Sequence, residues 1–487
     1  MPVTASIEEG NNMTTTRLFK ATTLAAALLL AGCASINIDQ AIDDTNAATT
    51  GFTQGKLTLA RTPEQRQARD QLAAELLGKP LTMDGAVQLA LANSPAVQTL
   101  LAQSWADMAN ANQGGRIANP LFTFEHMRLG NELDLDRLLS FGLLDLLTLP
   151  RRQSIAASQV AQARVQLSVR VVDQVSQVRQ AWVRAVAAQQ SLSYAEQVNR
   201  SAQASAELAR RMQEVGNFTK LQRARQHLFY ADATAQLAVA GQTALAAREE
   251  LVRQLGLTDE QAAQLKLPAR LPDLPAAPRD ASTLPATALQ QRLDVQMARL
   301  QLDAAGKSQG LNLIKSLVDV DLGLRHDTVF NTATGARDTR RGYELDIRLP
   351  LFDWGDAQRS AMNAQALAAA NRYDSVTRAA GSQLRESYGA YRTAYDLARH
   401  YRDEIVPLRQ AMAEENVLRY NGMLIGVFEL LADSREQIAS VMAAINAQQQ
   451  FWLADAGLSS SLLGKPTTMG ATAAPMASST GMEGTGH

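Results

Sequence analysis

Two short stretches of the chain alternate between apolar and polar residues without a break. They read "VDVDLGLR" and "YELDIRL", and a polar segment with several arginines separates them. A period of two is typical of a β-strand with one apolar and one polar face. The pair therefore predicts an amphipathic hairpin. Its apolar face comprises Val318, Val320, Leu322, Leu324, Tyr343, Leu345, Ile347 and Leu349.

Most of the remaining chain has helical spacing. Residues 34–61 are polar and are expected to be irregular. A short helix should begin after Thr62, which acts as N-cap and forms a capping box with Gln65. A further helix should begin after Thr82 and run, with a break at Pro95, to about residue 111.

The first half then predicts a less regular strand pair and two long helices. The strands are expected within "LFTFEHMRL" and "LDRLLSFGLLDLLTLP". Residues 151–214 contain neither proline nor glycine and predict one helix about 95 Å long, at about 1.5 Å per residue. Gly216 should end this helix, and a second helix should span residues 219–255.

The second half repeats this order. "TALQQRLDVQ" (287–296) echoes "LALANSPAVQ" (89–98), and the alternating hairpin follows. A long helix is expected from Asp356 to about Tyr420, with Gly422 ending it and a last helix reaching about Leu463. The predicted organisation is a signal peptide (1–32), an N-terminal segment (33–80), repeat 1 (81–260), a proline-rich linker (261–285), repeat 2 (286–463) and a low-complexity, disordered tail (464–487).

The N-terminal sequence predicts export and lipidation. "RLFKATTLAAALLLAGCAS" has a basic start, a short apolar run and then the only cysteine, Cys33. This layout is that of a signal peptide, and its end resembles a bacterial lipobox, after which Cys33 is lipidated. Met13 is a candidate start as well as Met1. Ala34 lacks the charge of an inner-membrane retention signal, which favours the outer membrane, with the chain extending into the periplasm.

The alternating strands have the length that a tilted strand needs to cross a bilayer. Open sheet edges are not tolerated in lipid, so such strands must close into a barrel. Four strands are too few, because bacterial barrels begin at eight. Several chains would therefore contribute to one barrel. The alternative is a soluble hairpin that covers a helical core.

The order and spacing of several motifs resemble the TolC-like outer-membrane efflux protein family over roughly residues 80–463. They are "LTMDGAVQLALANSPAV", "ALQQRLDVQ", "LPLFDWGDAQR" and "YNGMLIGVFELLADSREQ". The resemblance implies a mainly helical chain with a membrane β-barrel, built from a duplicated helix, hairpin, long helix, turn and helix. It implies a homotrimer with a twelve-stranded barrel and a periplasmic helical tunnel. Such proteins are passive ducts that dock to a periplasmic adaptor and an inner-membrane pump.

In that family the two helical turns form the periplasmic tips, where the adaptor docks. The resemblance assigns this role to Gly216 in the first turn and to Tyr420, Asn421 and Gly422 in the second. Glycine suits both turns because a helix that ends abruptly needs a residue with positive φ. The second turn departs from the family pattern, because Ile425 and its neighbour occupy the usual serine position.

Glu429 and Asp433 lie four residues apart, on one face of the last helix. If this face looks inward, three chains place six carboxylates at the tunnel entrance, and such a ring favours cations. The alternative is a pair of solvated helix charges, paired with Arg435 or Arg225.

Composition narrows the function further. The net charge is −1, from 47 basic and 48 acidic residues. The chain therefore lacks the excess of basic residues that is typical of proteins that bind nucleic acid. The five histidines are scattered, and no phosphate loop or nucleophile motif is present. No enzyme, cofactor or bound metal is therefore expected.

The predicted function is the outer-membrane channel of a tripartite efflux system. The second turn is similar to that of family members associated with heavy-metal or copper resistance, so metal ions are the first substrate hypothesis. Drug efflux and type I secretion are alternatives. A lipid-anchored periplasmic scaffold without a pore is the alternative from another class.

Overall fold

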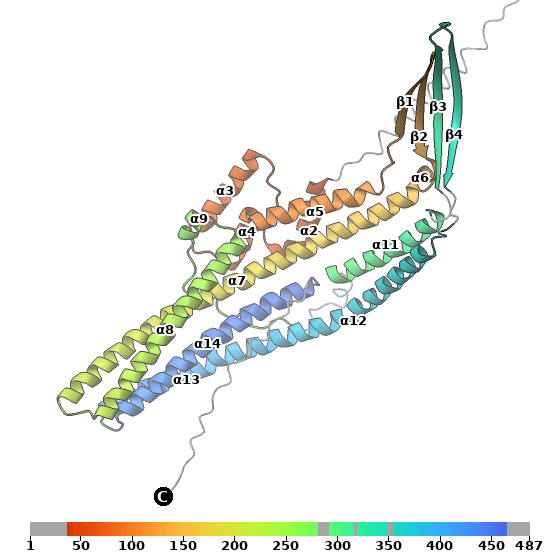
Figure 1. The fold of residues 1–487 in the computed structure, drawn as a ribbon. Coiled ribbons are helices and arrows are strands. Elements are labelled where there is room, and N and C mark those ends of the chain that lie inside the picture. The colour runs from red at the N-terminus through yellow and green to blue at the C-terminus, as the bar shows by residue number, and fades with distance from the viewer. Residues whose placement is uncertain (1–36, 281–291, 316–318, 349–351, 353, 465–487) are drawn as a thin grey trace, which may run out of the picture. The chain divides into compact units, whose positions relative to one another are not determined.

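The computed structural model describes residues 37–280, 292–315, 319–348, 352 and 354–464 (Figure 1). The predicted lipidation site Cys33 and the predicted strand residues Val318 and Leu349 lie outside these ranges. The chain forms two compact units. We call Met1–Thr45, Thr99–Leu167 and Gln296–Ser375 the strand unit, and Asn46–Gln98, Ser168–Val295 and Val376–His487 the turn unit.

The strand unit contains one antiparallel sheet in the order β1-β2-β3-β4 (Figure 1). Each repeat contributes one hairpin, and β2 pairs with β3 to join the two hairpins. The strands are β1 (Leu121–Leu129), β2 (Glu132–Gly142), β3 (Asp319–Asn331) and β4 (Arg337–Arg348).

The first hairpin ends earlier than the sequence predicts. The short helix α6 (Leu143–Leu147) follows β2, so the expectation of strand beyond Gly142 is wrong. The leucines on either side of Asp145 have the three- and four-residue spacing of a helical face. The carbonyl of Leu144 accepts a hydrogen bond of 2.7 Å from the Thr148 hydroxyl, which completes this turn.

The strand unit also contains parts of several helices. They are parts of α2 (Ile38–Thr53), α5 (Pro95–Gln113), α7 (Leu149–Glu214), α11 (Leu293–Lys315) and α12 (Asp356–His400). The Ser158 hydroxyl of α7 donates to Asp303 of α11 at 2.8 Å and accepts from Lys307 at 2.7 Å. This network ties the first repeat to the second, because α7 belongs to repeat 1 and α11 to repeat 2.

The turn unit contains the ends of α7 and α12 together with further helices. These are α3 (Pro63–Leu77), α4 (Met83–Asn93), α8 (Lys220–Leu255), α9 (Asp259–Gln264), α13 (Val406–Asn421) and α14 (Val427–Leu462). The predicted capping box at Thr62 is confirmed, and Thr82 caps the next helix as expected. None of the helices in the described ranges is long and apolar enough to cross a membrane.

The helix α2 corrects the expectation that residues 34–61 are irregular. Its buried face carries threonines as well as isoleucine and alanine. The Thr45 hydroxyl donates to the carbonyl of Ala41 at 2.9 Å, and the Thr53 hydroxyl donates to that of Thr49 at 3.2 Å. Because these hydroxyls are satisfied within their own helix, polar residues can be buried here.

The long helix of the second repeat has the predicted span, but its α-helical hydrogen-bond pattern is interrupted. A π-helical turn, η2 (Tyr401–Ile405), separates α12 from α13. Pro407 explains the change, since proline donates no backbone hydrogen bond and its ring clashes with the carbonyl four residues earlier, that of Asp403. Such π-helical turns are frequent at functional positions in helices.

Candidate functional site

The strand register places the predicted apolar residues on one face of the sheet. Val320 lies opposite Ile347, Leu322 opposite Leu345, and Leu324 opposite Tyr343. Four of these residues are exposed. Their exposed fractions are 82% for Tyr343, 53% for Leu324, 52% for Leu345 and 49% for Ile347. A monomer therefore presents an uncovered apolar face.

This apolar row continues into the first hairpin, which sequence reasoning left unassigned. Leu324 pairs with Leu139, and Leu139 pairs with Phe122. The row thus crosses all four strands. The alternation in this hairpin is broken by mixed residues, and only the register identifies Phe122 and Leu139 as members of the face. Nearer the hairpin loops the same face becomes charged, at Arg137 and Arg341.

The opposite face of the sheet carries an ion-pair network centred on Arg325. Its guanidinium lies 2.8 Å from carboxylate oxygens of both Asp136 and Asp327, and 3.7 Å from Glu344. Asp136 and Asp327 are buried, and each has a partner in Arg325. The sheet is consequently apolar on one face and charged on the other.

The first helical turn joins α7 to α8 in the turn unit. Gly216 has φ of +81° and adopts the left-handed conformation that the sequence predicts. The amide of Asn217 donates to the carbonyl of Met212 at 2.8 Å and closes the helix end. The next helix begins at once, with Thr219 as N-cap and Gln222 completing a capping box.

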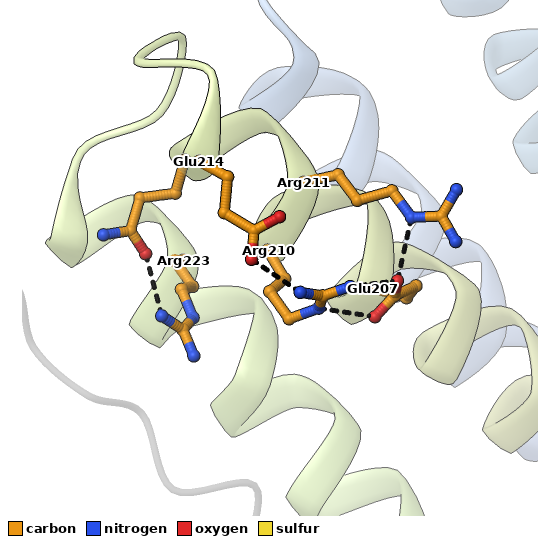
Figure 2. Close-up of polar contacts among 6 residues, drawn as sticks. Glu207, Arg210, Arg211, Glu214 and Arg223 are labelled. Atoms are coloured by element: carbon orange, nitrogen blue, oxygen red, sulfur yellow. Dashed lines mark hydrogen bonds and ion pairs between the residues drawn. The ribbon is translucent and has the colours of Figure 1, made fainter.

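An ion-pair network stiffens the last turns of α7 beside this turn (Figure 2). Glu207 accepts hydrogen bonds from both Arg210 and Arg211, and Arg210 also contacts Glu214 at 2.5 Å. Arg223 of α8 donates to Gln213 of α7 at 2.9 Å and links the two helices. The two guanidinium groups lower the pKa of the Glu207 carboxyl to about 2.

The second turn joins α13 to α14 and corrects one prediction. Gly422 has φ of −79°, so it is not the left-handed residue. Met423 takes that conformation instead, with φ of +59°. The left-handed position thus lies one residue later than the sequence suggests. The amide of Leu424 donates to the carbonyl of Arg419 at 2.8 Å and closes the helix end. Tyr420 and Asn421 are exposed beside it.

Glu429 and Asp433 lie on the first turns of α14. Glu429 is exposed, whereas Asp433 is half-buried and its Oδ2 atom has no hydrogen-bond partner. Among the ion pairs of the described residues, none joins either carboxylate to Arg435 or Arg225. The guanidinium of Arg435 instead lies over the Phe229 ring, 4.3 Å from its centre.

A groove of about 1290 Å³ runs between α7, α8 and α14 within the turn unit. Alanine is the commonest lining residue, and Tyr194, Phe229 and Arg435 contribute larger side chains. Small residues leave the helix backbones accessible along this groove. No group of three histidine, cysteine or acidic side chains within the described ranges is arranged to hold a metal ion.

The fold defines a class of protein. Solved structures that share it include a membrane protein from Pseudomonas aeruginosa, 20% identical over 78% of this chain and 93% of its own, with a TM-score of 0.66. The outer membrane protein VceC from Vibrio cholerae is 16% identical over 78% of this chain and 96% of its own, with a TM-score of 0.65. The CmeC outer membrane channel of Campylobacter jejuni is 13% identical over 84% of this chain and 89% of its own, with a TM-score of 0.66.

The chain has the fold of the TolC-like outer-membrane channels, which confirms the fold class predicted from the sequence. Residues 284–455, less than half of the chain, match the outer membrane efflux protein family. The resemblance to this family is therefore confirmed, and so is the expectation that the chain is not an enzyme. Among curated proteins, none matches the chain in sequence.

Proposed function

We propose that this chain is one protomer of a trimeric outer-membrane channel that serves a tripartite efflux system. The main support for the proposal is the sheet of the strand unit, which has one apolar face and one charged face. Its apolar row crosses all four strands, and the opposite face holds the buried ion pairs of Arg325. One face suits lipid and the other suits a water-filled lumen.

Assembly follows from the strand edges. β1 and β4 are the edges of a four-stranded sheet, and their free backbone groups cannot remain unpaired in lipid. Pairing β1 of one protomer with β4 of the next removes both edges. Three copies then give a barrel of twelve strands, within the range of known outer-membrane barrels. The lipid-facing residues proposed are those of the apolar row, with Val318 and Leu349 extending it.

The two helical turns are the proposed docking surface for a periplasmic adaptor, which in turn engages an inner-membrane pump. Gly216 and Gly422 mark these turns, with Tyr420 and Asn421 exposed at the second. The alanine-lined groove above them leaves room for a helix of a partner to approach closely. Lipidation of Cys33 would anchor the chain to the outer membrane, from which it extends into the periplasm.

Metal ions, copper among them, are the proposed cargo. The support is the similarity of the second turn, residues 420–437, to family members associated with metal resistance. Deleting the gene should then sensitise cells to one or two metals, with rescue by the intact gene. Sensitivity to drugs or detergents would assign the channel to drug efflux instead, and a loss of protein export would assign it to type I secretion.

Conductance distinguishes the channel from a lipid-anchored scaffold without a pore. Purified protein should run as heat-labile trimers and conduct ions after reconstitution into planar bilayers. Protein that lipase releases from membranes, and that gives no conductance, would exclude the channel. A matched control is the same protein with Leu345→Arg, which should not insert.

A further inference from the structure

The proline-rich segment that connects the repeats has a buried face with a period of three. Leu265, Leu271 and Leu274 are buried, and Pro268 is partly buried between them. Pro272, Pro275 and Pro278 are themselves spaced by three residues. A period of three is that of the polyproline II helix, which has three residues per turn and no internal hydrogen bonds. The carbonyls of such a segment need donors from elsewhere.

Side chains of α12 and α14 supply these donors. The indole N–H of Trp452 donates to the carbonyl of Pro272 at 3.1 Å, and Gln448 donates to the same carbonyl at 2.7 Å. The hydroxyl of Tyr395 lies 3.1 Å from the carbonyl oxygen of Pro275 and 3.2 Å from that of Ala276. Donors therefore meet carbonyls at successive turns of the segment.

Arg279 ends the segment and is held at both its backbone and its side chain. Its amide donates to the Tyr391 hydroxyl at 3.0 Å, and its carbonyl accepts from the Tyr388 hydroxyl at 3.1 Å. Its guanidinium lies 2.9 Å from Asp455, and it also donates to Ser459 at 3.2 Å. The side chain of this arginine, which follows the spaced prolines, is thus paired with the largely buried carboxylate of Asp455.

The contacting side chains form one continuous surface. They occur at helical spacing, so each helix presents them from one face. Phe451 packs between the two helices, with its ring centre 5.6 Å from that of Tyr391 and 5.7 Å from that of Tyr395. We define this surface, the aromatic face, as Tyr388, Tyr391, Tyr395, Gln448, Phe451, Trp452, Asp455 and Ser459.

We propose that the aromatic face is a recognition site for a proline-rich peptide in an extended conformation, and that residues 271–279 of the same chain occupy it as a clasp between α12 and α14. Proteins bind proline-rich segments in grooves lined by aromatic side chains. Here the hydroxyl and indole groups of such side chains donate hydrogen bonds to the carbonyls of the segment. Here ligand and site are covalently connected, so the effective concentration of the ligand is high.

The position of the clasp gives it a mechanical consequence. Its contacts on α12 lie about two to four helical turns before η2, and Tyr401 of η2 packs against the same aromatic cluster. The parts of α12 and α14 beside η2 are therefore held together by the segment as well as by direct packing. Separating the helices at this level requires release of the clasp.

Trypsin cleavage after Arg279 tests the proposal without reference to transport. A protease must bind an extended segment and the free arginine side chain, and both are engaged while the clasp is closed. The full-length protein in detergent is compared with the Tyr388→Phe/Tyr395→Phe double variant, which keeps both rings and loses both donors. Tyr343→Phe, on an exposed strand position, is the matched control.

The double variant should be cleaved after Arg279 at least about fivefold faster than the unaltered protein, because cleavage tracks the population of the released segment. The control should be cleaved at the original rate. Equal rates in all three proteins would overturn the clasp. If the double variant does not assemble, Tyr395→Phe alone tests the same claim, since its hydroxyl serves two carbonyls, and an unchanged rate there is equally decisive.

Discussion

Gly216 and Gly422 hold equivalent places in the two repeats, yet their backbones differ. Gly216 has positive φ, whereas Gly422 has φ of −79° and Met423 takes the left-handed conformation. A side chain in that conformation costs about 1–2 kcal/mol, and glycine avoids the cost. The first turn therefore depends on its glycine, and the second turn carries strain at Met423.

This difference predicts opposite responses to substitution. Gly216→Ala should speed amide hydrogen exchange at Asn217 about fivefold or more, as expected for a loss of about 1 kcal/mol. Gly422→Ala should leave exchange at Leu424 nearly unchanged, and Met423→Gly should slow it. Equal effects of the two alanine substitutions would contradict the assignment of the left-handed residues.

Glu207 predicts how the end of α7 responds to pH. Its pKa is lowered to about 2 by Arg210 and Arg211, so the ion pairs are complete above the ordinary carboxyl pKa of about 4.5. Their stabilising contribution should be lost as pH falls from about 4.5 towards 2. Protection of residues 207–214 against hydrogen exchange, measured relative to the intrinsic exchange rate at each pH, should decrease across this window.

Glu207→Gln should abolish that pH dependence and give faster exchange at neutral pH as well. Glu196→Gln provides the control, since Glu196 is an exposed carboxylate on the same helix. If exchange near Gly216 keeps its acid response in the Glu207→Gln protein, the network in Figure 2 does not stabilise this helix end.

Among the secondary-structure elements, β4 offers the sharpest test of the two-faced sheet. Leu345→Lys places a charge in the apolar row, and a charge on the lipid face of a barrel costs about 2–4 kcal/mol near the bilayer centre. Heat-labile trimers in outer-membrane fractions should become scarce. Asp346→Lys lies on the opposite face and should leave trimers intact. A reversed result would mean that the charged face meets lipid.

In the assembled channel, the carboxylates at the start of α14 are the candidate entrance gate. Replacing Glu429 and Asp433 together with Ala should lower the cation preference of the reconstituted channel, since rings of carboxylates favour cations. Glu415→Ala, an exposed carboxylate on α13, should leave selectivity unchanged. Unaltered selectivity in the double variant would assign both residues to ordinary solvated helix surface.

Local patterns in the sequence were sufficient for most elements of this protein. The caps at Thr62 and Thr82, the long helix up to Gly216 and the alternation in β3 and β4 depend on neighbours within a few residues, so they can be read along the chain. The motif order also predicted the fold class. Where the pattern was ambiguous, as for the threonine-rich α2, it was misread.

Tertiary structure alone decided how distant segments complete one another. Three contacts join residues separated by well over a hundred positions. They are the pairing of Leu139 with Leu324, the ion pair of Asp136 with Arg325 and the ion pair of Arg279 with Asp455. Such contacts exist only after the chain has folded, and no local periodicity records them. The sequence by itself determined most of the helices, the hairpins and the positions of the two turns, because these depend on near neighbours, whereas packing determined which faces they share.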